Sequence, residues 1–133
     1  MDLTISWWGV VLAALSMFAI GALWFGVLFA KPWQRAAGVT DEQLGRGFPA
    51  VLGGSFVLSL VAAVSLGFLI GAEGALFGTV VGLVTGVTFV GAFLGVVYLF
   101  ERRPLVHFAT NAGYAAIAFT AMGAILGASQ SGG

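Results

Sequence analysis

The chain has 133 residues, of which 60% are hydrophobic, 21 are glycine and only 8% are charged, and its net charge is zero. An average soluble domain carries about 25% charged residues, because polar groups have to cover much of its surface. This composition excludes an ordinary soluble domain and matches a lipid solvent. The zero net charge gives no footprint for nucleic acid, and the lack of cysteine rules out disulfides and thiolate chemistry.

Four long runs without any charged residue divide the chain. A membrane-spanning helix needs about 20 consecutive apolar residues, whereas strands of a membrane β-barrel need about ten and alternate in polarity. These runs do not alternate, so they predict an all-α polytopic membrane protein, a four-transmembrane-helix bundle that forms a single transmembrane domain over residues 1–133. We expect its helices at about 5–29, 50–70, 75–100 and 105–127, with a connecting loop at 30–49.

The first expected helix, residues 5–29, is too long for a cleaved signal peptide, and no basic n-region precedes it. Residues 8 and 24 are both tryptophan and lie about 24 Å apart at 1.5 Å per residue. This distance is close to the thickness of a bilayer core, which is typical of aromatic belts at the two interfaces. A ring-stacking ligand site is the alternative. The expected interface anchors are Trp7, Trp8, Trp24, Lys31 and Trp33.

The loop at residues 30–49 contains a helix-start pattern. Thr40 precedes Asp41, Glu42 and Gln43, which predicts a capping box at the start of a short surface helix. Before it, Gly38 is placed to end a turn of interfacial helix that begins near Lys31.

Every basic residue lies in the connection after the first or the third expected helix. Cytoplasmic loops of membrane proteins carry an excess of Lys and Arg, so these two connections are predicted to be cytoplasmic. Both termini are then outside, an N-out/C-out arrangement. The five basic residues are Lys31, Arg35, Arg46, Arg102 and Arg103.

Glycines recur at four-residue spacing along the third expected helix, which follows a tight turn at residues 71–74. Small residues at this spacing let helices approach closely in lipid. At about 100° per residue, the first four glycines and the last two fall on different faces. We therefore expect the third helix to lie at the centre of the bundle. The predicted packing residues are Gly74, Gly78, Gly82, Gly86, Gly91 and Gly95.

Polar side chains gather where the third expected helix ends and the fourth begins. They could form a small vestibule open to the cytoplasm, with Glu101 and His107 as a titratable pair and Asn111 as a hydrogen-bonding ligand. Alternatively they satisfy one another between helices, while Glu101 pairs with Arg102 or Arg35. The candidate vestibule residues are Tyr98, Glu101, His107, Thr110, Asn111 and Tyr114.

This polar set does not predict an enzyme. One histidine with scattered carboxylates is too few ligands for a metal, and no nucleophile is paired with a base. We expect no catalytic, cofactor-binding or metal-binding residue and no cofactor.

The stretch Gly21-Ala-Leu-Trp-Phe25, continued by Lys31 and Trp33 and joined by Gly113-Tyr114, resembles a known family. It is similar to the bacterial membrane proteins of the domain of unknown function 1761 family, as is the stretch at residues 101–104, Glu-Arg-Arg-Pro. The resemblance implies four hydrophobic segments and a multi-pass protein of the bacterial inner (cytoplasmic) membrane. It implies no activity, and it marks Trp24, Lys31 and Trp33 as the distinguishing residues.

The function that fits these features best is a non-enzymatic membrane subunit that self-associates or helps to assemble a larger complex. Its expected partners are the lipid bilayer and further copies or other membrane subunits, and no nucleic acid. The alternative is a small oligomeric transporter or channel for a small solute or ion, which would use the polar stripe on the fourth helix.

Overall fold

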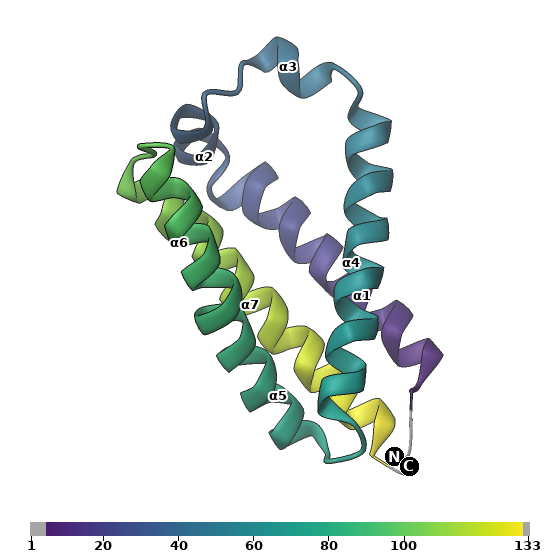
Figure 1. The fold of residues 1–133 in the computed structure, drawn as a ribbon. Helices are drawn as coiled ribbons and strands as arrows, with labels where there is room; N and C mark the ends of the chain where they lie inside the picture. Colours follow the sequence, from purple (N-terminus) through teal and green to yellow (C-terminus); the bar gives the residue numbers. More distant parts are fainter. Residues whose placement is uncertain (1–4, 132–133) are drawn as a thin grey trace.

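Four helices long and apolar enough to cross a membrane make up most of the chain (Figure 1). The computed structural model describes residues 5–131, and no strand occurs within that range. The predicted all-α fold with four membrane-capable helices is confirmed, and each bound lies within three residues of the expected one. These four spans are Trp7–Leu28, Phe48–Ile70, Ala75–Phe100 and Leu105–Gln130.

Two of the four spans contain a π-helical turn that the sequence pattern did not predict. The first span ends in one, and the third is interrupted by one in its middle. In chain order the elements are α1 (Trp7–Leu23), η1 (Trp24–Leu28), α2 (Ala30–Ala37), α3 (Asp41–Gly45), α4 (Phe48–Ile70), α5 (Ala75–Val84), η2 (Thr85–Val90), α6 (Gly91–Phe100) and α7 (Leu105–Gln130).

The short helices of the first connection begin and end as the sequence predicts. Thr40 Oγ1 accepts a hydrogen bond from the backbone of Gln43, while the Gln43 side chain accepts one from the backbone of Thr40. This reciprocal capping box starts α3. Gly38 ends α2 with a φ of 72°, a left-handed conformation that glycine adopts without steric cost.

The span at the centre of the bundle is α7, so the expectation that the third helix is central was wrong. α7 packs against α1, α4, α5, η2 and α6, whereas the third span packs chiefly against α7 (Figure 1). The predicted glycine seam is real but has one partner. A methyl group at Gly78 would collide with the backbone oxygen of Gly123, and one at Gly82 with that of Phe119. The two backbones are therefore in direct contact.

The π-turn η2 changes the direction in which the second half of the third helix faces. A π-turn takes one residue more than an α-turn. The residues after it are therefore rotated by about 100° relative to their positions in an unbroken α-helix. Gly95 then also faces α7, where a methyl group would lie 3.2 Å from the ring of Phe108. Gly91 is buried, but the nearest atom to a methyl group there is Gly86 O, at 3.3 Å.

A single side chain joins three elements at the end of the bundle where α1 begins and α7 ends. The Gln130 amide nitrogen donates to the backbone oxygens of Gly67 and Gly71, each at 3.0 Å, and its oxygen accepts from Ser6 N at 3.3 Å. Gln130 is buried and so replaces water for backbone groups at the last turn of α4. Sequence reasoning did not single it out.

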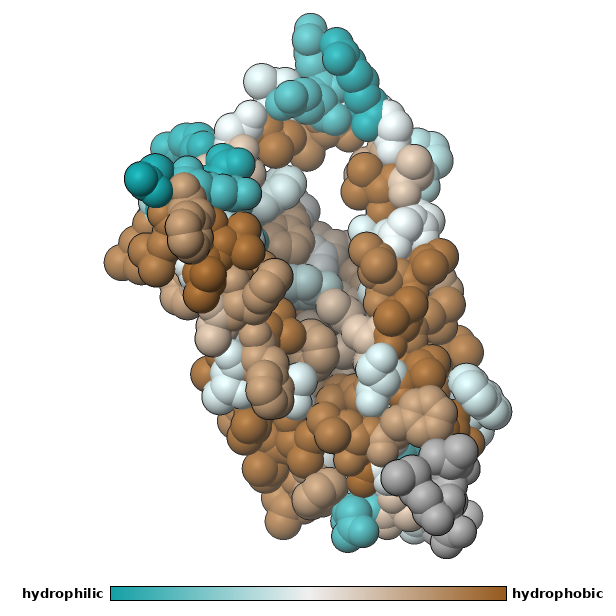
Figure 2. Space-filling model, viewed as in Figure 1, coloured by the Kyte–Doolittle hydropathy of each residue, from teal (hydrophilic) through white to brown (hydrophobic). Residues whose placement is uncertain are grey.

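The first half of α4 stands apart from the rest of the bundle. The buried residues of α4 all lie from Ser59 onward. In residues 48–58 every side chain is exposed except Phe56, which meets Phe18 edge to face at 6.1 Å. Figure 2 shows the molecule open on this side, between the start of α4 and the end of α1. The bundle is thus closed around the chain termini and open at the other end.

We predict that Gly82→Leu destabilises the fold, because the new side chain has to push the α5 and α7 backbones apart. Overpacking of this kind costs about 1–3 kcal/mol or more. Thermal melting in detergent would measure it. Gly26→Leu is the matched control, since nothing lies within 4 Å of a methyl group at that position. If both variants melt like the unmodified chain, close contact between α5 and α7 does not hold the bundle together.

Candidate functional site

The polar side chains predicted to form one vestibule are divided between two interfaces. α7 lies between α6 and α1, so a stripe about 100° wide on its surface faces α6 along one edge and α1 along the other. His107 and Asn111 contact α6, whereas Thr110 and Tyr114 contact α1 and its π-turn.

Tyr98, His107 and Asn111 form a polar triad between α6 and α7. The Asn111 Nδ2 atom donates to the Tyr98 hydroxyl at 2.8 Å and lies 3.3 Å from His107 Nε2. The Tyr98 and His107 rings meet edge to face, with 4.5 Å between their centroids. His107 is only 7% exposed, whereas Tyr98 and Asn111 are half-buried.

Two buried atoms of the triad, one on His107 and one on Asn111, have no hydrogen-bond partner within residues 5–131. Both protons of the Asn111 amide are engaged if His107 Nε2 accepts, and the ring proton of His107 is then on Nδ1. His107 Nδ1 and Asn111 Oδ1 are buried and have no partner among the residues that the structure describes. A buried polar group without a partner costs about 1–3 kcal/mol, so these two atoms call for an explanation.

Glu101 is not part of the triad. Its side chain is exposed, and its Oε1 atom accepts a hydrogen bond from Arg103 Nε at 3.1 Å. The predicted titratable pair of Glu101 and His107 does not form, because Glu101 follows the last turn of α6 and its carboxylate pairs with Arg103 instead. An exposed ion pair of this kind contributes little to stability.

Two reciprocal hydrogen bonds join α1 and its π-turn to α7. The Trp24 indole donates to the backbone oxygen of Thr110 at 2.8 Å, and the Tyr114 hydroxyl donates to the backbone oxygen of Met17 at 2.9 Å. Each ring thus reaches across to the backbone of the other helix. Thr110 also donates its own hydroxyl to Val106 O at 2.8 Å, within α7.

Each of these rings lies over a glycine of the opposite helix. A methyl group at Gly113 would be 3.1 Å from Trp24 Cζ2, and one at Gly21 would be 2.9 Å from the Tyr114 hydroxyl oxygen. The distance at Gly21 is shorter than real Cβ contacts and the distance at Gly113 is tighter than most of them, so the two glycines make room for the two rings. We call this set the aromatic junction: Gly21, Trp24, Phe25, Phe29, Trp33, Gly113 and Tyr114.

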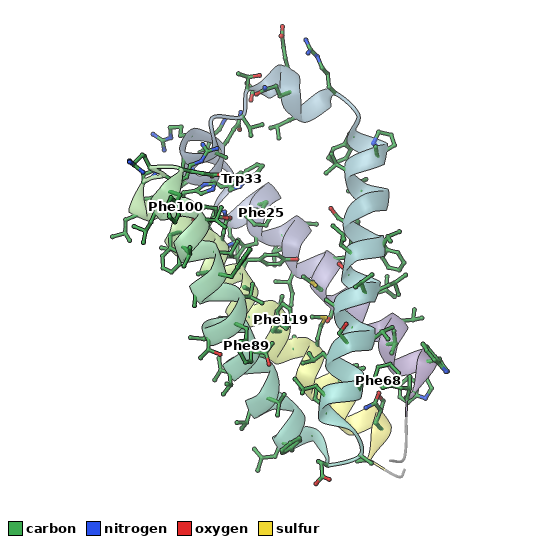
Figure 3. The ribbon with its side chains drawn as sticks, viewed as in Figure 1. Phe25, Trp33, Phe68, Phe89, Phe100 and Phe119 are labelled. Carbon is green, nitrogen blue, oxygen red and sulfur yellow. The ribbon has the colours of Figure 1, made fainter. Side chains whose placement is uncertain are left out.

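The π-turn η1 turns two successive aromatic residues into the bundle. It is closed by a hydrogen bond of 2.8 Å from Phe29 N to Trp24 O, five residues back. Trp24 then contacts Phe29, with 4.7 Å between the ring centroids. Phe25 contacts both Trp33 at 5.2 Å and Tyr114 at 5.1 Å, and Figure 3 shows Phe25 and Trp33 together at the start of α2. π-turns are frequent at functional sites.

The predicted interface anchors lie in different environments. Trp7 and Trp8 are each 63% exposed at the start of α1, and Lys31 is exposed on α2. Trp24 and Trp33 are instead half-buried members of the aromatic junction. The chemistry that the triad and the junction offer is hydrogen bonding and ring packing.

We predict that Trp24→Phe lowers the free energy of unfolding by about 1 kcal/mol, because it removes the hydrogen bond to Thr110. Denaturation with a harsh detergent, followed by circular dichroism, would measure the change. Trp8→Phe is the matched control and should be neutral, since its ring is exposed. Equal costs for the two variants would contradict a specific role of the Trp24 indole.

Comparison with known proteins assigns a family to this fold. No curated protein and no solved structure matches the chain. One family model does match, over residues 8–127, a range that includes both halves of the aromatic junction and the polar triad. Because the match covers most of the 133 residues, the chain belongs to the family described as Protein of unknown function (DUF1761).

Proposed function

We propose that this chain is a non-enzymatic membrane subunit that acts by associating with a second copy of itself. The observation that supports this is the first half of α4, which is apolar and exposed on nearly all sides within an otherwise packed bundle. We further propose that the protein spans the inner membrane of a bacterium, with the end that carries its basic residues in the cytoplasm.

Glycines in the middle of a membrane helix are useful where another helix comes close. In α5 and α7 this rule holds, since Gly78, Gly82 and Gly123 each touch the backbone of the partner helix. In α4, methyl groups added at Gly53 and Gly54 would have nothing within 4 Å. Glycine also costs a helix about 1 kcal/mol relative to alanine, so two adjacent ones without a contact are unexplained within one chain.

A second copy of the chain is the partner that accounts for this surface. Most oligomers of soluble proteins are symmetric dimers in which the same patch meets itself, and the same geometry applies to a helix pair in a bilayer. Ala50 and Gly54 form a small-xxx-small pair on α4, the spacing that lets two helices cross closely. In such a dimer α4 of each copy would pack against α4 of the other.

We predict that Gly53→Leu combined with Gly54→Leu weakens self-association at least about tenfold, a change of about 1.4 kcal/mol. The new side chains would hold two α4 helices apart, yet meet nothing within their own chain. Fluorescence energy transfer between labelled copies in lipid vesicles, at varied protein-to-lipid ratio, would measure the dissociation constant.

Gly26→Leu is again the matched control, because Gly26 is equally open but lies in η1. It should leave association unchanged. A chain that is monomeric at every protein-to-lipid ratio would overturn the proposal. Equal association of the double variant and the unmodified chain would remove α4 from the interface.

A transporter or channel for a small solute is the second candidate. It is favoured by the unused donor and acceptor of the polar triad, His107 Nδ1 and Asn111 Oδ1, which are buried between two membrane-spanning helices. A small solute with both a donor and an acceptor, such as an alcohol or an amide, would satisfy both atoms as it passed.

On this second candidate, Asn111→Leu should reduce solute flux to the level of empty vesicles, because it removes the central hydrogen-bonding group of the triad. Light scattering of vesicles after a glycerol or urea gradient would measure the flux. Asn111→Asp, which keeps an acceptor, should retain part of it. If the unmodified chain admits neither solute faster than empty vesicles do, transport of this class is excluded.

A further inference from the structure

Four of the five basic residues come together at one corner of the molecule. Lys31 and Arg35 lie one turn apart on α2, and Arg102 and Arg103 lie in the turn between α6 and α7. α2 packs against α7, so the two connections meet at the same end of the bundle (Figure 1). We call these four residues the basic corner. The fifth basic residue, Arg46, lies apart from it in the turn between α3 and α4.

A hollow in the surface adjoins this corner. Its lining consists of Lys31, Gln34, Arg35, Val39 and Asp41, from α2 and the start of α3. It therefore combines two cations, an amide and one carboxylate in a concave surface. The Asp41 carboxylate already accepts a hydrogen bond from Gln34 Nε2 at 2.7 Å, which holds the two helices in place.

The cations of α2 have no acidic partner in the described part of the chain, residues 5–131. The ion pairs there join Arg46 to Glu42 and Arg103 to Glu101, and neither Lys31 nor Arg35 has a carboxylate within 4.0 Å. Arg35 uses only its Nε atom, which donates to Lys31 O at 3.4 Å. The Lys31 ammonium group and the outer nitrogens of Arg35 are left for an external anion.

The position of the corner along the membrane normal identifies the kind of anion. α2 follows the first span directly, and its Trp33 packs on Phe25 at the end of that span, with 5.2 Å between the rings. If the chain spans the membrane as proposed above, the corner is level with the lipid headgroups. Just before the turn of α6 and α7, Leu99 and Phe100 are 77% and 79% exposed, an apolar surface for acyl chains next to Arg102 and Arg103.

We propose that the basic corner and its hollow bind the phosphate headgroup of an anionic phospholipid, whose acyl chains lie along the end of α6. Basic pockets at the cytoplasmic ends of membrane helices bind such headgroups, and each Lys or Arg near a charged surface adds to the attraction. The lipid is favoured over a soluble anion because the apolar surface adjoins the cations. The proposal is independent of self-association through α4.

The test compares Lys31→Gln combined with Arg35→Gln against Arg46→Gln, which removes one cation from outside the corner. Native mass spectrometry of protein extracted from vesicles of phosphatidylglycerol and phosphatidylcholine would count the retained lipids. We expect the unmodified chain to keep phosphatidylglycerol preferentially. The double variant should lose this preference by about tenfold or more, and Arg46→Gln should keep it. Melting curves of all three proteins would show that they are equally folded.

Three results would overturn the proposal. The double variant could retain phosphatidylglycerol like the unmodified chain, or Arg46→Gln could lose it to the same extent, which would indicate only a general charge effect. Excess inorganic phosphate could also displace the lipid completely, which would identify a site for free phosphate. An unfolded double variant would be replaced by Arg35→Lys, which keeps the charge but not the planar donor set and should weaken retention only in part.

Discussion

Direct backbone contact between α5 and α7 is the interaction on which the rest of the bundle depends. In lipid the hydrophobic effect contributes little to helix association, so dispersion forces between closely packed atoms have to hold the helices together. Gly78, Gly82 and Gly123 permit an approach that any side chain would prevent. With the third span fixed along one side of α7, its other sides are free for α1 and α4. The central position of α7 thus depends on the glycines on both sides of its contact with α5.

The two π-turns then decide which side chains reach the centre. η2 rotates the second half of the third span by about one residue, so that Gly95 faces α7 and Tyr98 can reach Asn111. η1 does the same at the end of the first span, where Trp24 and Phe25 both turn inward. η1 itself contains Trp24 and Phe25 of the aromatic junction, and η2 precedes α6, the helix that carries Tyr98 of the polar triad.

Charge spacing was sufficient to predict the four spans, because a bilayer excludes charge from every crossing whatever the packing. Packing could not be predicted in the same way. The predicted central helix was wrong because α7 takes that place. The constant rotation of about 100° per residue that was used to place Gly91 and Gly95 also does not hold through η2. Trp24 resembled an interface anchor because the sequence does not show that its indole lies beside the Thr110 backbone in the folded bundle. The sequence did contain a signal for the aromatic junction in two glycines. Gly21 lies three residues before Trp24, and Gly113 lies one residue before Tyr114.

The bundle is closed at one end and open at the other, and the candidate sites follow this division. Gln130 joins the start of α1, the end of α4 and the end of α7 through three hydrogen bonds, so the end near the termini is fixed. Because α4 is held there, its first half can stand away from α1 without loss of the fold. The candidate sites proposed above therefore lie towards the basic end: the open half of α4, the polar triad, and the corner around Lys31 and Arg35. Proteins depart from the local rules of packing and polar pairing mainly where they have a function to perform, and in this chain those departures gather at that one end.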